Sequence, residues 1–246
     1  MGYNLFSLRM KYFILRYIKL AFFYLQLHRI FGLFSSLYFN LYYFTRLSKW
    51  IYDQKKIGYN DYPCKWNYDR RYAFYQWVID NEKLDEQINY LEFGVASGES
   101  FKWFAQRMSH LQSRLCGFDT FDGLPEDWGP FKKGAFSNNS QPPEINDTRC
   151  RFYKGLFQQT LPAFLKDFDA GERTVVMMDA DLYSATLYVL TCLAPYLKKG
   201  DIIFFDEFVV PTHEFKAFLD FTESYYIKLE LIAAANNYYF AAFKVV

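Results

Sequence analysis

The order of hydrophobic and polar positions predicts alternating strands and helices from about residue 68 to the C-terminus. Short apolar runs bounded by polar residues indicate buried strands, and longer stretches with apolar residues three and four apart indicate helices. Helices are predicted at Tyr68–Lys83, Glu99–His110, Leu161–Phe168, Tyr183–Leu197 and Thr212–Tyr225. Strands are predicted at Tyr90–Val95, Leu115–Asp119, Cys150–Tyr153, Thr174–Asp179, Asp201–Asp206, Lys228–Ala235 and Tyr238–Val245. This alternation predicts an α/β fold with a doubly wound, mostly parallel, seven-stranded sheet.

The last two predicted strands break the alternation. Only Asn236 and Asn237 lie between them, and two such residues are typical of a tight hairpin. We therefore expect the final strand of the sheet to run antiparallel to its neighbours.

The chain before this α/β domain (residues 68–246) has a different pattern. Residues 1–52 are dense in Leu, Ile, Phe and Tyr and predict a helical extension, and the polar residues 53–67 predict a connector. The longest uncharged run, Ile30–Thr45, has 16 residues, fewer than the roughly 20 that a membrane-spanning helix needs. Basic residues within the apolar stretch also argue against a signal peptide.

Charge separates the two regions. The whole chain carries 28 basic and 27 acidic residues, so nothing favours nucleic acid as a partner. Residues 1–52, however, contain seven basic and no acidic residues, namely Arg9, Lys11, Arg16, Lys19, Arg29, Arg46 and Lys49. Basic residues among aromatic ones suit helices in the interface of an anionic membrane. The alternative is that these helices pack on the domain or on a second subunit, which would give a homodimer.

The cysteines indicate a reducing compartment. Cys64, Cys116, Cys150 and Cys192 lie far apart, and only three histidines accompany them. Neither a zinc site nor a disulfide framework is predicted. We expect a cytoplasmic protein, peripheral at the inner face of the membrane if the helical extension binds lipid.

A glycine-containing loop is the first candidate site. Residues 91–100 form a strand end followed by a helix start, and Gly94 and Gly98 allow a ligand to approach the backbone closely. The segment has neither the Gly-x-Gly-x-x-Gly pattern of dinucleotide sites nor the Gly-x-Ser-x-Gly pattern of a nucleophile elbow. An ordinary strand-to-helix turn is the alternative.

A carboxylate follows at the end of the next strand. Asp119 comes 25 residues after Gly94, where an acidic side chain can accept both hydroxyls of a ribose. An isolated Asp at this place can equally cap a turn. Its pairing with the glycine loop favours a binding role.

Four more carboxylates end two apolar strands. Asp179 and Asp181 follow one strand, and Asp206 and Glu207 follow the next. The carboxyl ends of parallel strands meet at one edge, so we expect these side chains to converge. Their repulsion would be relieved by a divalent cation, and oxygen ligands favour Mg²⁺, Mn²⁺ or Ca²⁺ over zinc. Capping of the following helices could account for one or two of the four.

Several segments occur in the order typical of one enzyme family. They are Glu92-Phe93-Gly94, Gly117–Pro125, Lys154–Pro162, Asp179–Thr186 and Asp206-Glu207-Phe208. With these motifs, the region Tyr68–Val246 resembles the macrocin O-methyltransferase family. Members of that family are class I S-adenosylmethionine-dependent methyltransferases with a Rossmann-like fold, and they methylate sugar hydroxyls with the help of Mg²⁺. The helical extension has no counterpart in the pattern.

The resemblance implies a role for each candidate residue. The cofactor S-adenosylmethionine would lie at the edge that contains Glu92, Gly94, Ser97, Gly98, Ser100, Asp119 and Thr120. The metal ligands would be Asp179, Asp206 and Glu207, and Asp181 would be the general base. The chain departs from the family in having Glu207 where the second residue of an Asp-Asp pair is common, and in having Lys199 where a Gly-Gly pair is usual.

The function expected from the sequence is therefore a metal-assisted O-methyltransferase acting on a hydroxyl of a sugar or glycan-type acceptor. The long segment Phe121–Thr148 would serve as a substrate lid or be a surface loop. Two alternatives stay open. One is a metal-dependent glycosyltransferase that uses Asp179-Ala180-Asp181, and the other is a non-catalytic adaptor docked on a membrane.

Overall fold

The structure is a computed structural model that describes residues 5–54 and 57–246, with side chains from Met10 onward. The side chain of Arg9 and residues 55 and 56 of the predicted connector lie outside the described residues. The chain divides into two compact units, residues 1–46 and 47–246, which are described separately.

The first unit is helical, as predicted. It contains α1 (Leu5–Tyr24), α2 (His28–Phe31), the 3-10 helix η1 (Gly32–Phe34) and most of α3 (Ser35–Asp53). No single described helix is both long and apolar enough to cross a membrane. The helices Met10–Tyr24 and His28–Asp53, which meet at a bend of 78°, reach the required length and hydropathy only as a pair.

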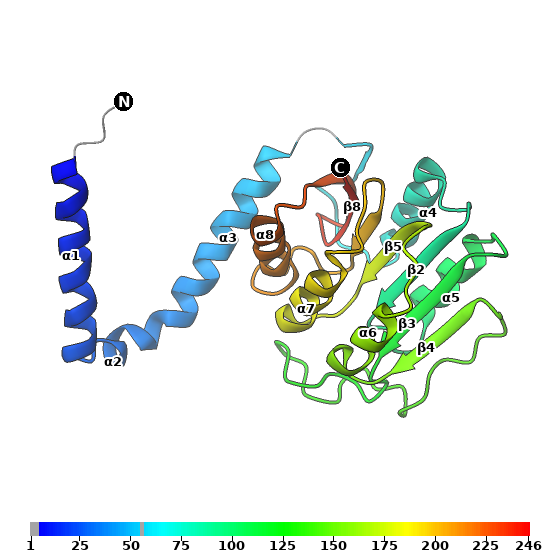
Figure 1. Cartoon of the computed structure of the whole chain (residues 1–246), viewed down its shortest axis with the longest axis horizontal. Helices are drawn as coiled ribbons and strands as arrows, with labels where there is room; N and C mark the ends of the chain where they lie inside the picture. The colour runs from blue at the N-terminus through cyan, green and yellow to red at the C-terminus, as the bar shows by residue number, and fades with distance from the viewer. Residues whose placement is uncertain (1–4, 55–56) are drawn as a thin grey trace. The chain divides into compact units, whose positions relative to one another are not determined.

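The second unit is an eight-stranded sheet with helices on both faces (Figure 1). Its strands are β1 (Tyr59–Asn60), β2 (Ile88–Phe93), β3 (Arg114–Asp119), β4 (Cys150–Lys154), β5 (Arg173–Met178), β6 (Ile202–Phe205), β7 (Leu229–Ala235) and β8 (Phe240–Val245). Its helices are the last part of α3 together with α4 (Arg70–Glu82), α5 (Glu99–Arg107), α6 (Phe157–Leu165), α7 (Tyr183–Leu193) and α8 (Glu214–Tyr225).

The strand order is β1-β7-β8-β6-β5-β2-β3-β4. All described pairings are parallel except those of β8, which runs antiparallel to β6 and β7, so the predicted antiparallel last strand is confirmed. The sheet has one strand more than predicted, because Tyr59 and Asn60 of the expected connector pair with β7. A strand of two residues has no periodicity by which the sequence could reveal it.

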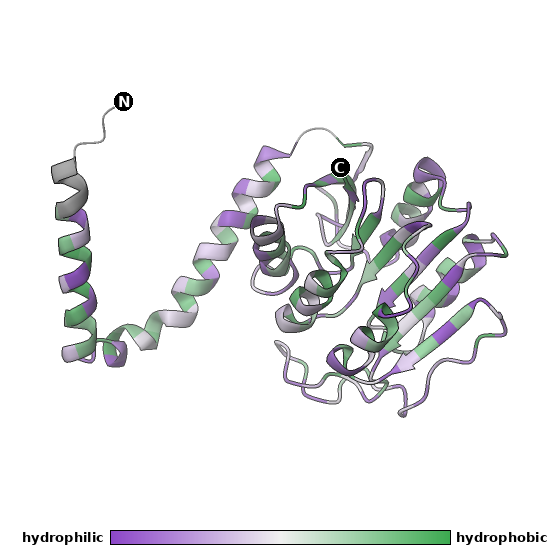
Figure 2. Cartoon of the chain, in the orientation of Figure 1, coloured by the Kyte–Doolittle hydropathy of each residue, from purple (hydrophilic) through white to green (hydrophobic). Residues whose placement is uncertain are grey.

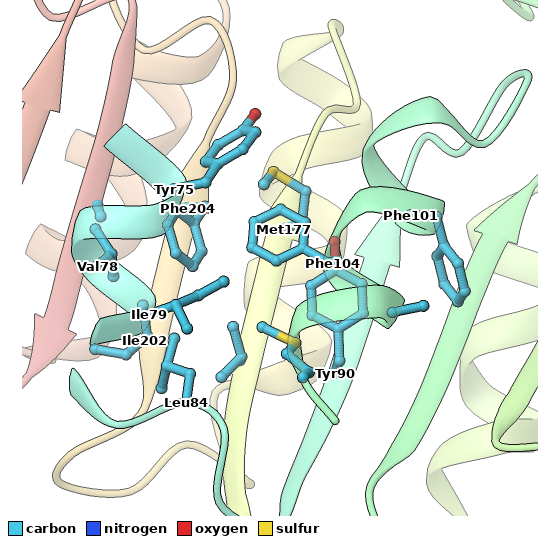
Figure 3. Close-up of a cluster of buried hydrophobic side chains, with 14 of the residues drawn as sticks. Tyr75, Val78, Ile79, Leu84, Tyr90, Phe101, Phe104, Met177, Ile202 and Phe204 are labelled. Atoms are coloured by element: carbon cyan, nitrogen blue, oxygen red, sulfur yellow. The ribbon is translucent and has the colours of Figure 1, made fainter. Parts of the chain in front are cut away.

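One face of the sheet packs against α4 and α5. Tyr90, Met177 and Phe204 of the central strands meet Tyr75 of α4 and Phe104 of α5 in a cluster of fully buried side chains (Figure 3). The next residue along β6, Phe205, lies on the opposite face, where its ring packs 6.2 Å from Phe218 of α8. Because side chains alternate between two buried faces, the central strands consist of unbroken apolar runs.

The end of α3 belongs to this unit. Trp50 packs its ring 4.9 Å from Phe208, 5.9 Å from Phe218 and 6.0 Å from Phe243. Trp50 therefore serves the core of the α/β unit, although it falls within the predicted helical extension.

The turn between β7 and β8 holds the segment that leads into α4. Asn236 and Asn237 both adopt left-handed backbone conformations, which Asn tolerates well. The side-chain oxygen of Asn236 accepts a hydrogen bond from the amide of Asn67 at 3.0 Å, and that of Asn237 accepts one from Cys64 at 2.9 Å. The loop between β7 and β8 has four residues, 236–239, and not the two predicted, and its two asparagines fix the start of α4 beside the sheet.

Candidate active site

A cavity of about 740 Å³ lies at the carboxyl ends of β2, β3, β5 and β6. It is lined by most of the predicted site residues, namely Gly94, Ser97, Ser100, Asp119, Thr120, Asp179, Asp181, Asp206 and Glu207. A larger hollow of about 1050 Å³ lies against β3, β4 and α6, but none of the strand-end carboxylates reaches it. We place the candidate site in the smaller cavity because the carboxylates and hydroxyls that could bind a ligand or take part in a reaction line it.

Gly94 allows two strand ends to approach closely. Its φ is +96°, and a Cβ atom at this position would lie 1.7 Å from the carbonyl oxygen of Asp179. The amide of Gly94 donates to the carbonyl of Phe118 at 3.0 Å, and the amide of Asp179 donates to that of Phe93 at 2.9 Å. Only glycine fits here, and its absence of a side chain brings the glycine loop next to the acidic strand ends.

Gly98 lies behind the glycine loop. A Cβ atom here would lie 2.7 Å from Cγ of Pro143, and Gly98 does not line the cavity. Its φ of +79° turns the chain into α5 beneath the long segment 120–149. The structure thus places Gly98 in the packing behind the loop.

Glu92 also lies behind the glycine loop and does not line the cavity. Its carboxyl group is fully buried, and it accepts hydrogen bonds from the Ser100 hydroxyl at 2.7 Å and from the Tyr90 hydroxyl. Burial raises the pKa of Glu92 to about 8, against the lowering effect of these two hydrogen bonds. Glu92 therefore anchors the first turn of α5, which borders the cavity.

Asp119 fixes the wall of the cavity through hydrogen bonds from backbone amides. One of its oxygens accepts a hydrogen bond from the amide of Ala96 at 2.7 Å, and the other accepts one from the amide of Phe121 at 2.7 Å. Ala96 has a φ of +45°, a strained conformation that this bond helps to maintain. Each carboxylate oxygen has a second lone pair for a ligand. The neighbouring Thr120 donates its hydroxyl to the carbonyl of Gly123 at 3.0 Å and so shapes the same turn.

The carboxylates of the acidic strand ends lie close enough to shift one another's pKa. Burial, followed by repulsion from Asp206 and Asp119, raises the pKa of Asp181 to about 7. Burial and the charges of Asp206 and Asp181 raise the pKa of Asp179 well above its ordinary value. The pKa of Glu207 rises to about 8, mainly through burial. These groups hold protons at a pH where exposed carboxylates are ionised.

A fifth carboxylate, Glu214, was not predicted. It is fully buried at the start of α8, and its Oε2 accepts a hydrogen bond from the amide of Glu207 at 3.0 Å. Burial and the charge of Glu207 raise its pKa. Glu214 adds a fifth buried carboxyl group beneath the strand ends.

Neither of the predicted capping alternatives accounts for these acids. The N-cap residue of α7 is Leu182 and that of α8 is His213, and neither cap involves a side-chain hydrogen bond. Asp181, which precedes Leu182, has a φ of +57°, an unusual conformation for a residue with a side chain. A strained residue beside a cavity is common at functional sites.

Tyrosine hydroxyls stabilise the carboxylates. Tyr75 donates to one oxygen of Asp206 at 2.8 Å, and Tyr68 is 3.4 Å from the other. The Tyr239 hydroxyl donates to Glu207 Oε1. The sequence analysis missed all three tyrosines, because they come from segments far from the acidic motifs.

Arg71 is the buried cation of the cavity and was also missed. Its guanidinium lies over the rings of Tyr68 and Tyr72, at 4.3 and 4.9 Å, and donates to both tyrosine hydroxyls at 2.9 Å. It forms a long ion pair of 3.4 Å with Glu99, whose side chain is 74% exposed. Its Nε is buried and finds no hydrogen-bond acceptor among the described residues. One signal in the sequence was available: an arginine in the first turn of a helix, close to several tyrosines.

The chemistry of the acidic donor set fits a hard divalent cation. All the donors are carboxylate oxygens, and Glu207 Oε2 is buried with no hydrogen-bond partner among the described residues. Within that part of the chain, no three potential ligands are already grouped as a metal site. Asp206 instead uses its oxygens to accept the tyrosine hydrogen bonds described above.

Comparison with known proteins supports the assignment of the fold. Residues 91–208 match the protein family described as a methyltransferase domain, whereas no curated protein matches the chain. Among solved structures, CalS11, a calicheamicin methyltransferase, shares 20% identity with a TM-score of 0.57 over 83% of this chain and 91% of that chain. The apo structure of CalS11, a TDP-rhamnose 3'-O-methyltransferase, gives 22% identity and a TM-score of 0.51 over 83% and 93%.

Two further solved structures are similar. The O-methyltransferase NovP shares 20% identity with a TM-score of 0.52 over 72% of this chain and 78% of that chain. A structure of CmcI with Mg and SAM shares 16% identity with a TM-score of 0.50 over 81% and 84%. The fold of this chain is thus the Rossmann-like class I methyltransferase fold expected from the sequence.

The close approach at Gly94 leads to a stability prediction. We expect Gly94→Ala to lower the free energy of unfolding by clearly more than Gly134→Ala. Gly134 has a similar φ of +85° but open space around its Cα, so that variant measures only the strain of a positive φ, about 1–2 kcal/mol. Urea denaturation of both variants measures the difference. Equal losses would show that the strand ends do not pack as described.

The buried carboxyl of Glu92 leads to a pH prediction. A folded-state pKa of about 8 means that the stabilisation contributed by protonated Glu92 is complete below about pH 4.5 and is lost as the pH rises to about 8. We expect Glu92→Gln to reduce the fall in the free energy of unfolding over that range. The exposed control Glu86→Gln should leave the pH profile unchanged. Parallel profiles for wild type and Glu92→Gln, measured by urea denaturation, would contradict the buried state of Glu92.

Proposed function

We propose that this chain transfers the methyl group of S-adenosylmethionine to a hydroxyl of a sugar or glycan-type acceptor. The match of residues 91–208 to a methyltransferase domain and the class I methyltransferase fold support this proposal. The observation that carries this proposal is the single cavity in which the glycine loop, Asp119 and the acidic strand ends meet. An O-methyltransferase needs a cofactor site and a proton acceptor within reach of each other, and this cavity offers both.

The cofactor half of the cavity is formed by Gly94, Ser97, Ser100, Asp119 and Thr120. S-adenosylmethionine, when bound, supplies an electrophilic methyl group on a sulfonium. The bare backbone at Gly94 permits close approach, and the free lone pairs of Asp119 suit the two ribose hydroxyls. Glu92 and Gly98 contribute from behind, by fixing the loop and α5.

Arg71 is suited to bind the carboxylate of the amino-acid part of the cofactor. Its side chain lines the same cavity, and its described partners are neutral tyrosine hydroxyls and the exposed Glu99. Its Nε is buried without an acceptor among the described residues, so the guanidinium still has a donor for an incoming anion. The rings of Tyr68 and Tyr72 on the guanidinium fix its direction.

The acidic half of the cavity is suited to a divalent cation, Mg²⁺ or a similar ion, held by Asp179, Asp206 and Glu207. Such an ion would lower the pKa of an acceptor hydroxyl by several units. Burial already holds the pKa of these carboxyls above the usual range, and repulsion from neighbouring acids adds to this for Asp179 and Glu207. The CmcI structure with Mg and SAM supports this proposal by analogy of fold.

Asp181 is the residue suited to accept the proton of the acceptor hydroxyl. Its pKa of about 7 lies near neutral pH, where a general base is most effective. Its side chain lines the cavity and is held by the strained backbone turn before α7. The helix-cap alternative is not needed to explain its place.

The acceptor side of the cavity is aromatic. Trp128 and Phe131 stack at 5.3 Å, and both line the cavity with Phe136 from the segment 120–149. Such rings suit the faces of a sugar or a nucleotide base. The TDP-rhamnose acceptor named for CalS11 supports a nucleotide-activated sugar as the first substrate class to test.

The two alternatives are less well supported. A glycosyltransferase that uses Asp179 and Asp181 gives no role to the glycine loop, and a non-catalytic adaptor gives none to the intact acidic cluster. The family match at residues 91–208 also favours methyl transfer over both.

The role of Asp181 can be tested with a panel of nucleotide-activated deoxysugars as acceptors. We expect Asp181→Asn to lower turnover by about 10² or more and to leave the affinity for S-adenosylhomocysteine unchanged, because it removes only the proton acceptor. The increase of kcat with pH near 7 should disappear as well. Asp167→Asn, outside the cavity, is the control. If Asp181→Asn kept most of its turnover on every active acceptor, Asp181 would not be the base.

The role of Arg71 can be tested by calorimetry with two ligands. We expect Arg71→Gln to weaken S-adenosylhomocysteine binding by about 10- to 100-fold, the effect of losing hydrogen bonds to a charged group. Methylthioadenosine has no amino-acid carboxylate, so its affinity should change little. Arg70→Gln, one position earlier on the same helix and paired with Asp61, is the control. An equal loss for both ligands would assign Arg71 a structural role instead.

A further inference from the structure

The described part of α1 exposes apolar side chains on every side. The consecutive residues Tyr12, Phe13, Ile14 and Leu15 are 69%, 60%, 51% and 52% exposed. Successive residues of an α-helix point about 100° apart, so four in a row cover its whole circumference. The exposed basic residues Lys11, Arg16 and Lys19 lie within about 140° of one another around α1, so the apolar side of the helix is unusually wide.

The described helix α3 repeats this feature before it reaches the α/β unit. Leu37, Tyr38 and Phe39 are 62%, 56% and 44% exposed, and Leu41 and Tyr42 on the next turn are 60% and 56% exposed. Figure 2 shows hydrophobic residues along the whole of both helices, and hydrophilic residues are interspersed among them. A flat protein interface covers one side of a helix and would leave the other apolar sides in water. The interface of a lipid layer can take up the wide apolar side of each helix while the basic side chains stay among the headgroups.

The charge of this region indicates which lipid surface fits. Residues 1–52 contain seven basic and no acidic residues, so they are complementary to an anionic headgroup layer. Two copies of the same region would bring like charges together, which disfavours a homodimer built from it. The long stems of Lys and Arg can lie along apolar surface while their charged ends reach the headgroups.

The position of Arg29 indicates the depth of insertion. Residues 20–45 contain no Asp, Glu or Lys, and Arg29 is their one Arg. Arg29 lies near the bend that separates α1 from α3. In an arrangement that crosses the bilayer, this bend would lie near its centre, where a charge is costly. At the interface, Arg29 can reach the headgroups.

We propose that residues 10–46 insert into the interface of an anionic lipid membrane and hold the enzyme there. The proposal rests on the first unit alone and does not depend on the proposed function of the cavity. Lipid binding would confine the enzyme to acceptors at the membrane surface, where tethering raises their effective concentration.

The test is sedimentation of the full chain with vesicles of phosphatidylcholine containing phosphatidylglycerol. We expect binding to these vesicles and much weaker binding to pure phosphatidylcholine. Raising the salt from about 0.1 M to 1 M shortens the Debye length from about 10 to 3 Å, which should weaken binding without abolishing it, because the apolar insertion remains. Complete release at high salt would overturn insertion.

A pair of matched variants identifies the binding surface. The triple variant Arg16→Gln, Lys19→Gln, Arg29→Gln should lose about fivefold in vesicle affinity for each charge removed. The control Lys102→Gln, Lys166→Gln, Lys228→Gln changes the net charge equally at exposed positions of the α/β unit and should bind normally. Equal affinities for the two triple variants would contradict the proposal. So would a stable dimer in light scattering that does not bind anionic vesicles, whatever its affinity for S-adenosylhomocysteine.

Discussion

Crowded negative charge at the carboxyl ends of β5 and β6 is the constraint on which the candidate site depends. Asp179, Asp181, Asp206, Glu207 and Glu214 end or follow apolar segments. Burial raises the pKa of each, and repulsion from neighbouring acids adds to this for all of them except Asp206. Buried charge without compensation costs several kcal/mol, so the surrounding structure must offset it. Tyrosine hydroxyls, retained protons and the Arg71 guanidinium do so in part. A divalent cation and a sulfonium would each relieve the remaining repulsion, which is why an acidic edge suits the proposed reaction.

The rest of the α/β unit positions the other cavity-lining residues around that edge. Gly94 lets β2 and β5 approach until the glycine loop contacts the acidic strand end, and Asp119 holds the loop by its backbone amides. Asn236 and Asn237 fix the segment before α4, so that Tyr68 and Arg71 reach the cavity from the opposite side. The cavity wall is therefore assembled from backbone contacts between segments far apart in the chain.

Much of this arrangement could be predicted from the sequence, because it depends on local patterns. Apolar runs identified the central strands, and the rule that parallel strands end at one edge brought Asp119, Asp179 and Asp206 together. The face of the sheet on which the Glu92 side chain lies was harder to predict. Glu92 follows Tyr90 by two positions, so strand alternation directs it under α5 and behind the loop. That inference was available from the strand assignment.

Other features could not be read from local patterns. Tyr75 and Asp206 are 131 positions apart, and only the packing of α4 on the sheet brings them together. The strand β1 is too short for a periodic signal, and it forms because β7 offers a free edge. The fold relatives that share this architecture are at most 22% identical among those compared, so they show how the chain folds and leave the acceptor to experiment.

The central claim is that the cofactor lies between the glycine loop and the acidic strand ends. Hydrogen exchange of the full chain with and without S-adenosylhomocysteine tests it most directly, because bound ligand slows the opening of the backbone that it contacts. We expect slower exchange at Gly94–Ser100 and Asp119–Gly123, the segments that line the cavity. Protection confined to the hollow beside β4 and α6, or no protection at all, would contradict the account.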